Sequence, residues 1–231
     1  MHFQVSVKET DLDIGICKHI YSGKMVKLVQ KMVTDVRVEL ENYINNDPDF
    51  KLRLSPHRVN DFAPKIAKEM AYSAEIADVG PMAAVAGAFS EYIGKRLLEY
   101  SPEVIIENGG DIYIKTTKKR NVAIFAGESP FSNRIAVEIL PEWGVVGICT
   151  SSGTVGHSFS FGKADAAVVI SNSCALADAS ATAVGNIINK SEDVQEAVVY
   201  ASKIPGILGA IAIKDEKMAA WGQIKLVPIK K

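Results

Sequence analysis

The chain has 231 residues, of which 48% are hydrophobic and 23% charged, a composition typical of folded globular proteins and not of disordered or fibrous ones. Its 26 basic and 27 acidic residues leave a formal net charge of −1, which gives no general attraction to nucleic-acid phosphates. No apolar run approaches the roughly 18 residues that span a membrane, and the N-terminus lacks a secretory signal pattern. We therefore expect a cytoplasmic protein with no nucleic-acid and no membrane partner. Its three cysteines are widely spaced without a CxxC pair, which indicates neither a disulfide framework nor a zinc site.

The first hundred residues predict two strands followed by helices. Alternation of apolar and polar residues predicts strands over 2–8 and 11–18. Apolar spacing then predicts a long amphipathic helix from about 21 to 44, which the NNDPDF segment should end because Pro48 cannot continue a helix. After an irregular connector over 51–60, two alanine-rich helices are expected at about 63–77 and 81–99. Alanine or glycine stands at 83, 84, 86, 87 and 88, and so little side chain on that surface requires the close approach of another backbone or of a flat ligand.

Beyond residue 102 the pattern changes to short β-branched segments separated by turns. These segments predict strands of a mostly antiparallel sheet, and they read VIIEN, DIYIKT, NVAIFAG, RIAVEIL, VVGIC and AAVVIS. Helices are expected at about 174–189 and 193–202, and two or three strands at the end of the chain. Blocks of strands and blocks of helices indicate an α+β fold, here a mostly antiparallel sheet with packed alanine-rich helices.

The segment ENGGDIYI, residues 107–114, predicts a hairpin. Asn-Gly between two alternating apolar runs is a turn whose central residues need positive φ, and this alone would explain it. A functional interpretation is also open, because Gly109 and Gly110 would let a ligand touch the backbone and Asp111 would offer an acceptor at the rim.

Two further segments could carry chemistry. CTSSGTVGHSFSFGKAD, residues 149–165, is either a flexible loop or a set of hydroxyl and N–H groups suited to phosphate, and His157 is its only side chain that titrates near neutral pH. In SNSCALADASATAVGN, residues 171–186, Asp178 and Thr182 lie four apart on one helix face. They offer either oxygen ligands for Mg²⁺ or only an acid favoured by the helix dipole and a core threonine.

Together and in this order, the segments resemble the ApbE superfamily of FAD:protein FMN transferases. ENGGDI is similar to the family's Asn-x-Gly-Gly-Asp-Ile, and ADASATAV to its Ala-Asp-Ala-x-Ala-Thr-Ala-x helix. DVGPMAAVAGA resembles its Asp-Leu-Gly-Gly-Ile-Ala-Lys-Gly segment, and TSSGTVGHSF its Ser-Gly…His-Ile-Ile-Asp-Pro region. The matched core, about 78–186, implies a single ApbE-like, T-fold-related domain over residues 1–231. The strands and long helix of residues 1–60 would complete it or form a homo-oligomer interface.

The resemblance implies a site for a small phosphorylated ligand, a flavin nucleotide (FAD or FMN), together with Mg²⁺. The metal ligands would be Asp178 and Thr182, and His157 would be catalytic, assisting proton transfer while Mg²⁺ polarises the pyrophosphate. The flavin pocket would be lined by residues of the hairpin and of the hydroxyl-rich loop: Asn108, Gly109, Gly110, Asp111, Ser151, Ser152, Gly153 and Thr154.

The chain also departs from the family's pattern. Ala84 stands where the family has its lysine, Pro81 replaces a glycine, and Ser160 and Phe161 replace the aspartate and proline after the histidine. Three hypotheses therefore stay open: a Mg²⁺-dependent FAD pyrophosphatase or FMN transferase relative, a non-enzymatic ligand carrier, and a component of anaerobic sulfide or homocysteine metabolism. The third comes from the archaeal, uncharacterised branch of the family that the sequence resembles, and from Cys149 and Cys174, which adjoin the expected site.

Overall fold

The computed structural model describes residues 1–153 and 162–229, and its helices and strands form the expected α+β fold. The main sheet has eight strands in the order β1-β2-β3-β4-β7-β8-β9-β10, and neighbouring strands are antiparallel throughout. These strands are β1 (His2–Val7), β2 (Thr10–Ile16), β3 (Val104–Asn108), β4 (Asp111–Lys115), β7 (Val145–Ser151), β8 (Ala166–Ser171), β9 (Ile207–Lys214) and β10 (Lys217–Gly222).

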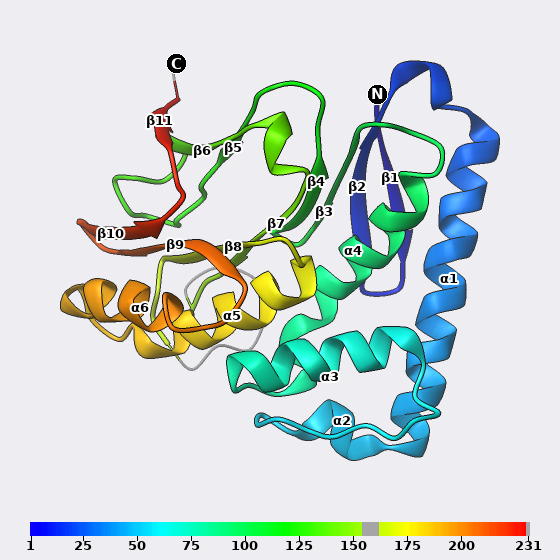
Figure 1. Ribbon diagram of the computed structural model, residues 1–231, viewed down its shortest axis with the longest axis horizontal. Coiled ribbons are helices and arrows are strands. Elements are labelled where there is room, and N and C mark those ends of the chain that lie inside the picture. Colours follow the sequence, from blue (N-terminus) through cyan, green and yellow to red (C-terminus); the bar gives the residue numbers. More distant parts are fainter. Residues whose placement is uncertain (154–161, 230–231) are drawn as a thin grey trace.

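A smaller sheet and the helices cover opposite faces of the main sheet (Figure 1). The smaller sheet has the order β11-β6-β5 and consists of β5 (Arg120–Ala123), β6 (Ile135–Ile139) and β11 (Leu226–Pro228). The helices are α1 (Gly23–Asn46), α2 (Pro48–Leu52), α3 (Lys65–Ala77), α4 (Val85–Leu97), α5 (Cys174–Ile187) and α6 (Val194–Ala201). Short 3₁₀ turns are η1 (Lys18–Ile20), η2 (Pro81–Ala84), η3 (Pro141–Trp143) and η4 (Ser191–Asp193).

Alternation along the strands divides the core into two parts. In β7, Val146 and Ile148 face the smaller sheet and belong to the apolar cluster between the sheets. Cys149 faces the helices and belongs to the larger cluster beneath them. Because successive strand residues point to opposite faces, β3, β4, β7, β8, β9 and β10 supply side chains to both clusters. The neighbours of a polar residue in one of these strands therefore show which face of the sheet its side chain is on.

Helix α5 lies unusually close to the sheet and to α4, because glycines stand at the contacts. A Cβ added at Gly147 of β7 would lie 2.4 Å from the Cα atom of Cys174, and a Cβ added at Gly87 of α4 would lie 2.4 Å from the carbonyl oxygen of Cys174. Of the two partners that the small residues at 83–88 allowed, another backbone is the one found at Gly87.

The structure corrects three element boundaries. Pro48 ends α1 as expected but also starts α2, since proline suits the first turn of a helix, so residues 51 and 52 are helical. The helix expected over 81–99 begins as the 3₁₀ turn η2 and continues as α4 only from Val85 to Leu97. The NVAIFAG segment contributes only its first three residues to β5.

The N-terminal segment is part of the main sheet. Strand β2 pairs with β3, with Leu12 opposite Asn108, and α1 packs against β1. In the part of the chain that the structure describes, no helix has the length and apolar character needed to cross a membrane.

Candidate functional site

The glycine hairpin joins β3 to β4 as the sequence predicts. Asn108 pairs with Asp111, and the two residues between them have positive φ, 64° at Gly109 and 103° at Gly110. The N–H of Gly110 donates to Oε1 of Glu107 at 2.8 Å. The turn therefore needs glycine at Gly110, where φ lies beyond the left-handed region that other residues tolerate.

The hairpin is fixed to α4 by two side chains. The Asn108 amide donates to the carbonyl oxygen of Ala86 at 3.1 Å, and the Ser90 hydroxyl donates to the carbonyl oxygen of Asp111 at 3.2 Å. Asn108 and Asp111 are both buried. Hydrogen bonds between buried polar groups fix how two elements pack. Here they fix the hairpin against α4, with the Asp111 side chain on the face of the main sheet that α4 and α5 cover.

Asp178 reaches the same place from α5. Its Oδ2 accepts a hydrogen bond from the backbone N–H of Gly87 at 2.8 Å, in the first turn of α4, where backbone N–H groups lack partners within the helix. A Cβ at Gly87 would lie 2.7 Å from the Cβ of Asp178. Helix α5 begins as predicted, because the Ser173 hydroxyl accepts from the N–H of Leu176.

Asp111, which is buried, and Asp178, which is half-buried, form a carboxylate pair. Burial raises the pKa of Asp111 to about 7, and the nearby Cys149 thiol and Thr150 N–H lower it only in part. Burial, and next the charge of Asp111, raises the pKa of Asp178 well above its usual value. Oδ1 of Asp111 is buried and has no hydrogen-bond partner within residues 1–153 and 162–229. Neighbouring carboxyl groups whose pKa values are raised in this way are typical of functional sites.

Thr182 lies one turn after Asp178 on α5, half-buried. Within the described residues, no three His, Cys, Asp or Glu side chains gather as a metal site. Residues of this kind fit a hard cation that takes one or two carboxylates and completes its shell with hydroxyl, carbonyl, water or phosphate oxygens, as Mg²⁺ does. Such a cation would give the unpartnered oxygen of Asp111 a ligand interaction and would compensate the negative charge of Asp178.

The start of the hydroxyl-rich loop is described only in part. Ser151 ends β7, and its hydroxyl lies beside α5, where a Cβ at Gly185 would be 3.3 Å from Ser151 Oγ. Ser152 and Gly153 both donate to the carbonyl oxygen of Ala164, at 3.3 and 2.9 Å. Thr154 and His157, and also Ser160 and Phe161, lie outside the described residues.

The two cysteines that adjoin the site are buried thiols. Cys149 and Cys174 are at most 1% exposed, with their sulfur atoms 3.6 Å apart, and Cys149 donates to the carbonyl oxygen of Cys174 at 3.4 Å. Burial raises the pKa of both thiols, that of Cys149 strongly. Since the thiolate is the reactive form, these cysteines contribute packing and hydrogen bonding.

The sequence analysis missed Glu91, which holds the start of α5. Its carboxylate is 5% exposed and accepts from the Ser173 hydroxyl at 2.9 Å and from the N–H of Ala175 at 3.1 Å. Lys95 pairs with its other oxygen at 2.6 Å. A signal was available, because Gly87 and Gly94 recur on the same face of α4 as Glu91 and indicate a face packed closely against other elements.

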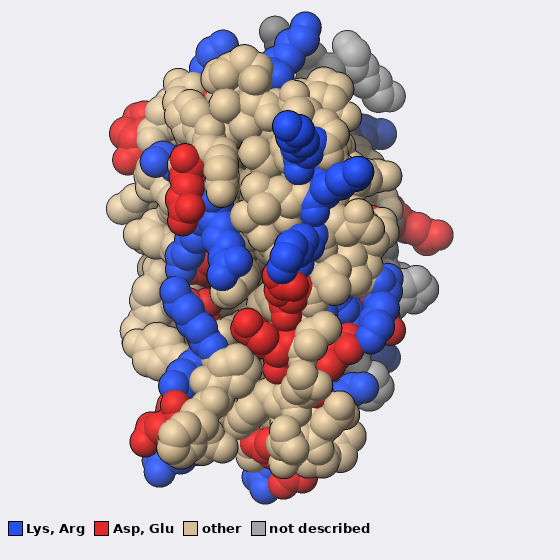
Figure 2. Space-filling view, turned by 90° about the vertical axis from the view of Figure 1, so that its right-hand side faces the viewer, with Lys and Arg blue, Asp and Glu red and all other residues tan. Residues whose placement is uncertain are grey.

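A groove of about 590 Å³ adjoins this site between α1 and the start of α4. Asn108 and Ala86 line it, so it borders the residues that anchor the hairpin. Its apolar lining comes from Leu40, Ile44, Met82, Val85 and Phe89, and its charged lining from Lys8, Glu9, Arg37, Glu41 and Lys51. On the face that carries α1, Lys and Arg side chains lie among Asp and Glu side chains (Figure 2).

Comparison with known proteins gives both relatives and structural neighbours. The family model described as AbpE bacteria matches residues 1–212. A UPF0280 protein of Methanococcus aeolicus is 40% identical over 229 residues, which cover 94% of this chain and 91% of the relative. A UPF0280 protein of Methanothrix thermoacetophila is 40% identical over 205 residues, which cover 88% of this chain and 86% of the relative.

The solved structures show the same fold at low sequence identity. The apo form of the flavinyl transferase ApbE of Pseudomonas stutzeri superposes with a TM-score of 0.60 at 11% identity, covering 96% of this chain and 93% of that one. The flavin transferase ApbE of Vibrio cholerae gives a TM-score of 0.54 at 14% identity, covering 96% of each chain. The resemblance found in the sequence is thereby confirmed: the chain belongs to the AbpE bacteria family and is an ApbE-like protein of the UPF0280 group.

Proposed function

We propose that this chain binds a flavin nucleotide with Mg²⁺ at the Asp111–Asp178 pair and acts on the pyrophosphate of FAD. The observation that carries the proposal is the pair itself. Asp111 is buried and has one oxygen without a partner among the described residues, and the half-buried Asp178 places a second carboxylate beside it. Holding the ionised Asp111 side chain out of water next to a second carboxylate is unfavourable when no positive charge compensates it. A divalent cation would supply that charge.

The chain's own residues would divide the work. Asp178 and Thr182 would hold the metal, and Gly87 keeps the Asp178 carboxylate oriented through its N–H. The positive-φ glycines would let the phosphates approach the hairpin backbone closely. Bound there, Mg²⁺ would neutralise charge that develops on the pyrophosphate. His157 stays the proposed proton-transfer residue, and Ser151, Ser152, Gly153 and Thr154 stay proposed ligand contacts.

The groove beside α1 would take the remainder of the dinucleotide. Its apolar lining suits a ring system, and its basic side chains suit phosphate. Arg37 has a buried Nε without a hydrogen-bond partner among the described residues, although its other nitrogens bind Thr10, Glu9 and Glu41. Ala84, where the family has lysine, is completely buried, so a positive partner for phosphate would have to come from Lys8, Arg37 or Lys51 of the groove instead.

The absence of that lysine favours a second candidate function, a carrier that binds the flavin nucleotide without cleaving it. Both functions use the same site, so turnover distinguishes them. The structure does not favour a thiol mechanism at Cys149 or Cys174, because both thiols are buried and burial raises their pKa values.

The test is to titrate the purified protein with FAD in Mg²⁺ or in EDTA, following flavin fluorescence, and to assay for FMN and AMP. Asp178→Asn keeps an acceptor for the Gly87 N–H but removes the charge, so we expect at least a tenfold loss of Mg²⁺-dependent affinity. Asp35→Asn, a surface aspartate on α1, is the matched control. Equal FAD binding by wild type and Asp178→Asn, in Mg²⁺ and in EDTA, would refute the metal assignment. Binding without FMN and AMP would establish the carrier.

A further inference from the structure

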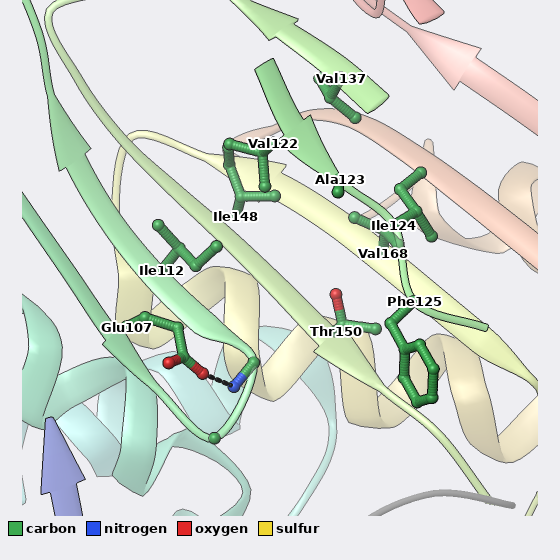
Figure 3. A pocket seen from close by; sticks show the side chains of 12 residues that line it. Glu107, Ile112, Val122, Ala123, Ile124, Phe125, Val137, Ile148, Thr150 and Val168 are labelled. Carbon is green, nitrogen blue, oxygen red and sulfur yellow. Dashed lines mark hydrogen bonds between the residues drawn. The ribbon is translucent and has the colours of Figure 1, made fainter. Parts of the chain in front are cut away.

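A second cavity lies on the other side of the main sheet, between that sheet and the smaller one (Figure 3). Its volume is about 290 Å³. Most of its lining is branched and apolar, from both sheets: Ile112, Val122, Ile124, Val137, Ile148 and Val168. A largely apolar concave site of this size, with a few polar groups, is typical of small-molecule binding sites.

Polar groups gather at one end of this cavity. Figure 3 shows the polar side chains of Glu107 and Thr150 at this end, together with the ring of Phe125, and most of the branched apolar side chains toward the other end. Glu107 is the only charged residue among those that line the cavity in the described chain. One of its oxygens accepts from the N–H of Gly110, which leaves the other for a ligand. Phe125 is 52% exposed and presents an aromatic ring at the opening.

This cavity is distinct from the carboxylate pair. Ile112 follows Asp111 in β4 and points to the opposite face, because side chains alternate along a strand. The sheet therefore separates the cavity from Asp111, and Gly110 and Thr150 border the cavity at its edge. Ligand binding in this cavity is therefore independent of the proposed flavin function.

We propose that the cavity binds a fused-ring amine, with the rings among the branched side chains and the protonated amine at Glu107. The size argument is direct: an apolar cavity of ~150 Å³ holds benzene, so about twice that volume holds two fused rings. The charge argument selects the polar end, because a lone carboxylate at the mouth of an apolar cavity favours a cation and repels an anion. Phe125 adds a ring face against which the ligand can stack.

The experiment compares two probes of nearly equal size and opposite charge, 1-(aminomethyl)naphthalene and 1-naphthoate. Binding is followed by naphthalene fluorescence at neutral pH, with Mg²⁺ and with EDTA. We expect the amine to bind at least tenfold more tightly than the carboxylate, and equally in both buffers. Equal affinity for the two probes, or no binding of the amine at millimolar concentration, overturns the proposal.

Two kinds of variant locate the bound amine. Glu107→Gln keeps an acceptor for the Gly110 N–H and should abolish the preference for the amine, whereas Glu142→Gln, at an exposed glutamate, should not. Val168→Phe fills the cavity but is a core substitution, so Val122→Phe is made as well, because Val122 lines the cavity from a half-buried position of β5. Each filling variant that folds should weaken amine binding at least tenfold. Unchanged affinity in folded Val122→Phe places the probe elsewhere and refutes the site.

Discussion

Substituting Gly87 by alanine tests the contact that brings α4 and α5 together. The new Cβ would lie 2.4 Å from the carbonyl oxygen of Cys174 and 2.7 Å from the Cβ of Asp178. Both neighbours are held by the α5 backbone and cannot rotate away, so the helices must separate locally by about 1 Å, and overpacking of this kind costs about 1–3 kcal/mol. Alanine's better helix propensity returns at most about 1 kcal/mol. We therefore expect Gly87→Ala to destabilise the protein by about 1–2 kcal/mol.

The assay is urea unfolding followed by circular dichroism, in which such a loss lowers the midpoint by roughly 0.5 M for an m-value of about 2–3 kcal/mol/M. Gly23→Ala is the matched control, because a Cβ at Gly23 meets nothing within 4 Å and the site lies at the start of α1. A Gly87→Ala protein as stable as wild type, with Gly23→Ala unchanged, would refute the close packing of α4 on α5. If the proposed function is correct, Gly87→Ala also weakens Mg²⁺-dependent FAD binding.

Three further outcomes follow from the buried groups. The pKa of Asp111 is raised to about 7 in the folded protein, so the folded state holds this proton more tightly than the unfolded state does. The free energy of unfolding therefore falls as pH rises from about 4 to about 7. In metal-free buffer, urea unfolding of Asp111→Asn should show a smaller fall over this pH range. Glu91→Ala leaves two donors at the start of α5 without their acceptor and should cost about 2–3 kcal/mol, while Glu91→Gln costs less; equal losses in urea unfolding would contradict this role. Of the three free cysteines only Cys17 is partly exposed, so a thiol reagent should modify one thiol rapidly in the native protein and all three in urea.

Local chemistry in the sequence was sufficient to predict the hairpin and α5. Asn-Gly-Gly between apolar runs requires positive φ, and both glycines have it. Ser173 caps α5 where a hydroxyl residue precedes an alanine-rich run. These predictions depend only on residues adjacent in the chain, which is why they are confirmed.

Contacts between distant segments could not be predicted in the same way. Asp111 and Asp178 are 67 positions apart in the sequence, and nothing local to either indicates that their charges interact. The resemblance to the ApbE superfamily placed both at one site, which the residues alone did not. The small side chains at 83–88 left the choice between a backbone and a ligand open, because only the position of α5 decides it. The start of α2 at Pro48 was missed because proline both ends one helix and favours the first turn of the next.

The packing around Asp178 explains how a costly carboxylate pair can persist in a folded chain. Glycines at 87 and 147 let α5 approach α4 and β7 to backbone contact, and Glu91 fixes the first turn of α5. These contacts belong to the large helix-side core, which continues far beyond the site. The surrounding structure therefore holds the two carboxylates together, although the charge of Asp111 makes ionisation of Asp178 less favourable. A ligand that supplies positive charge at this point therefore meets an arrangement already formed. Little binding free energy is then needed to order the carboxylates, and the cation's interaction with them can appear as affinity.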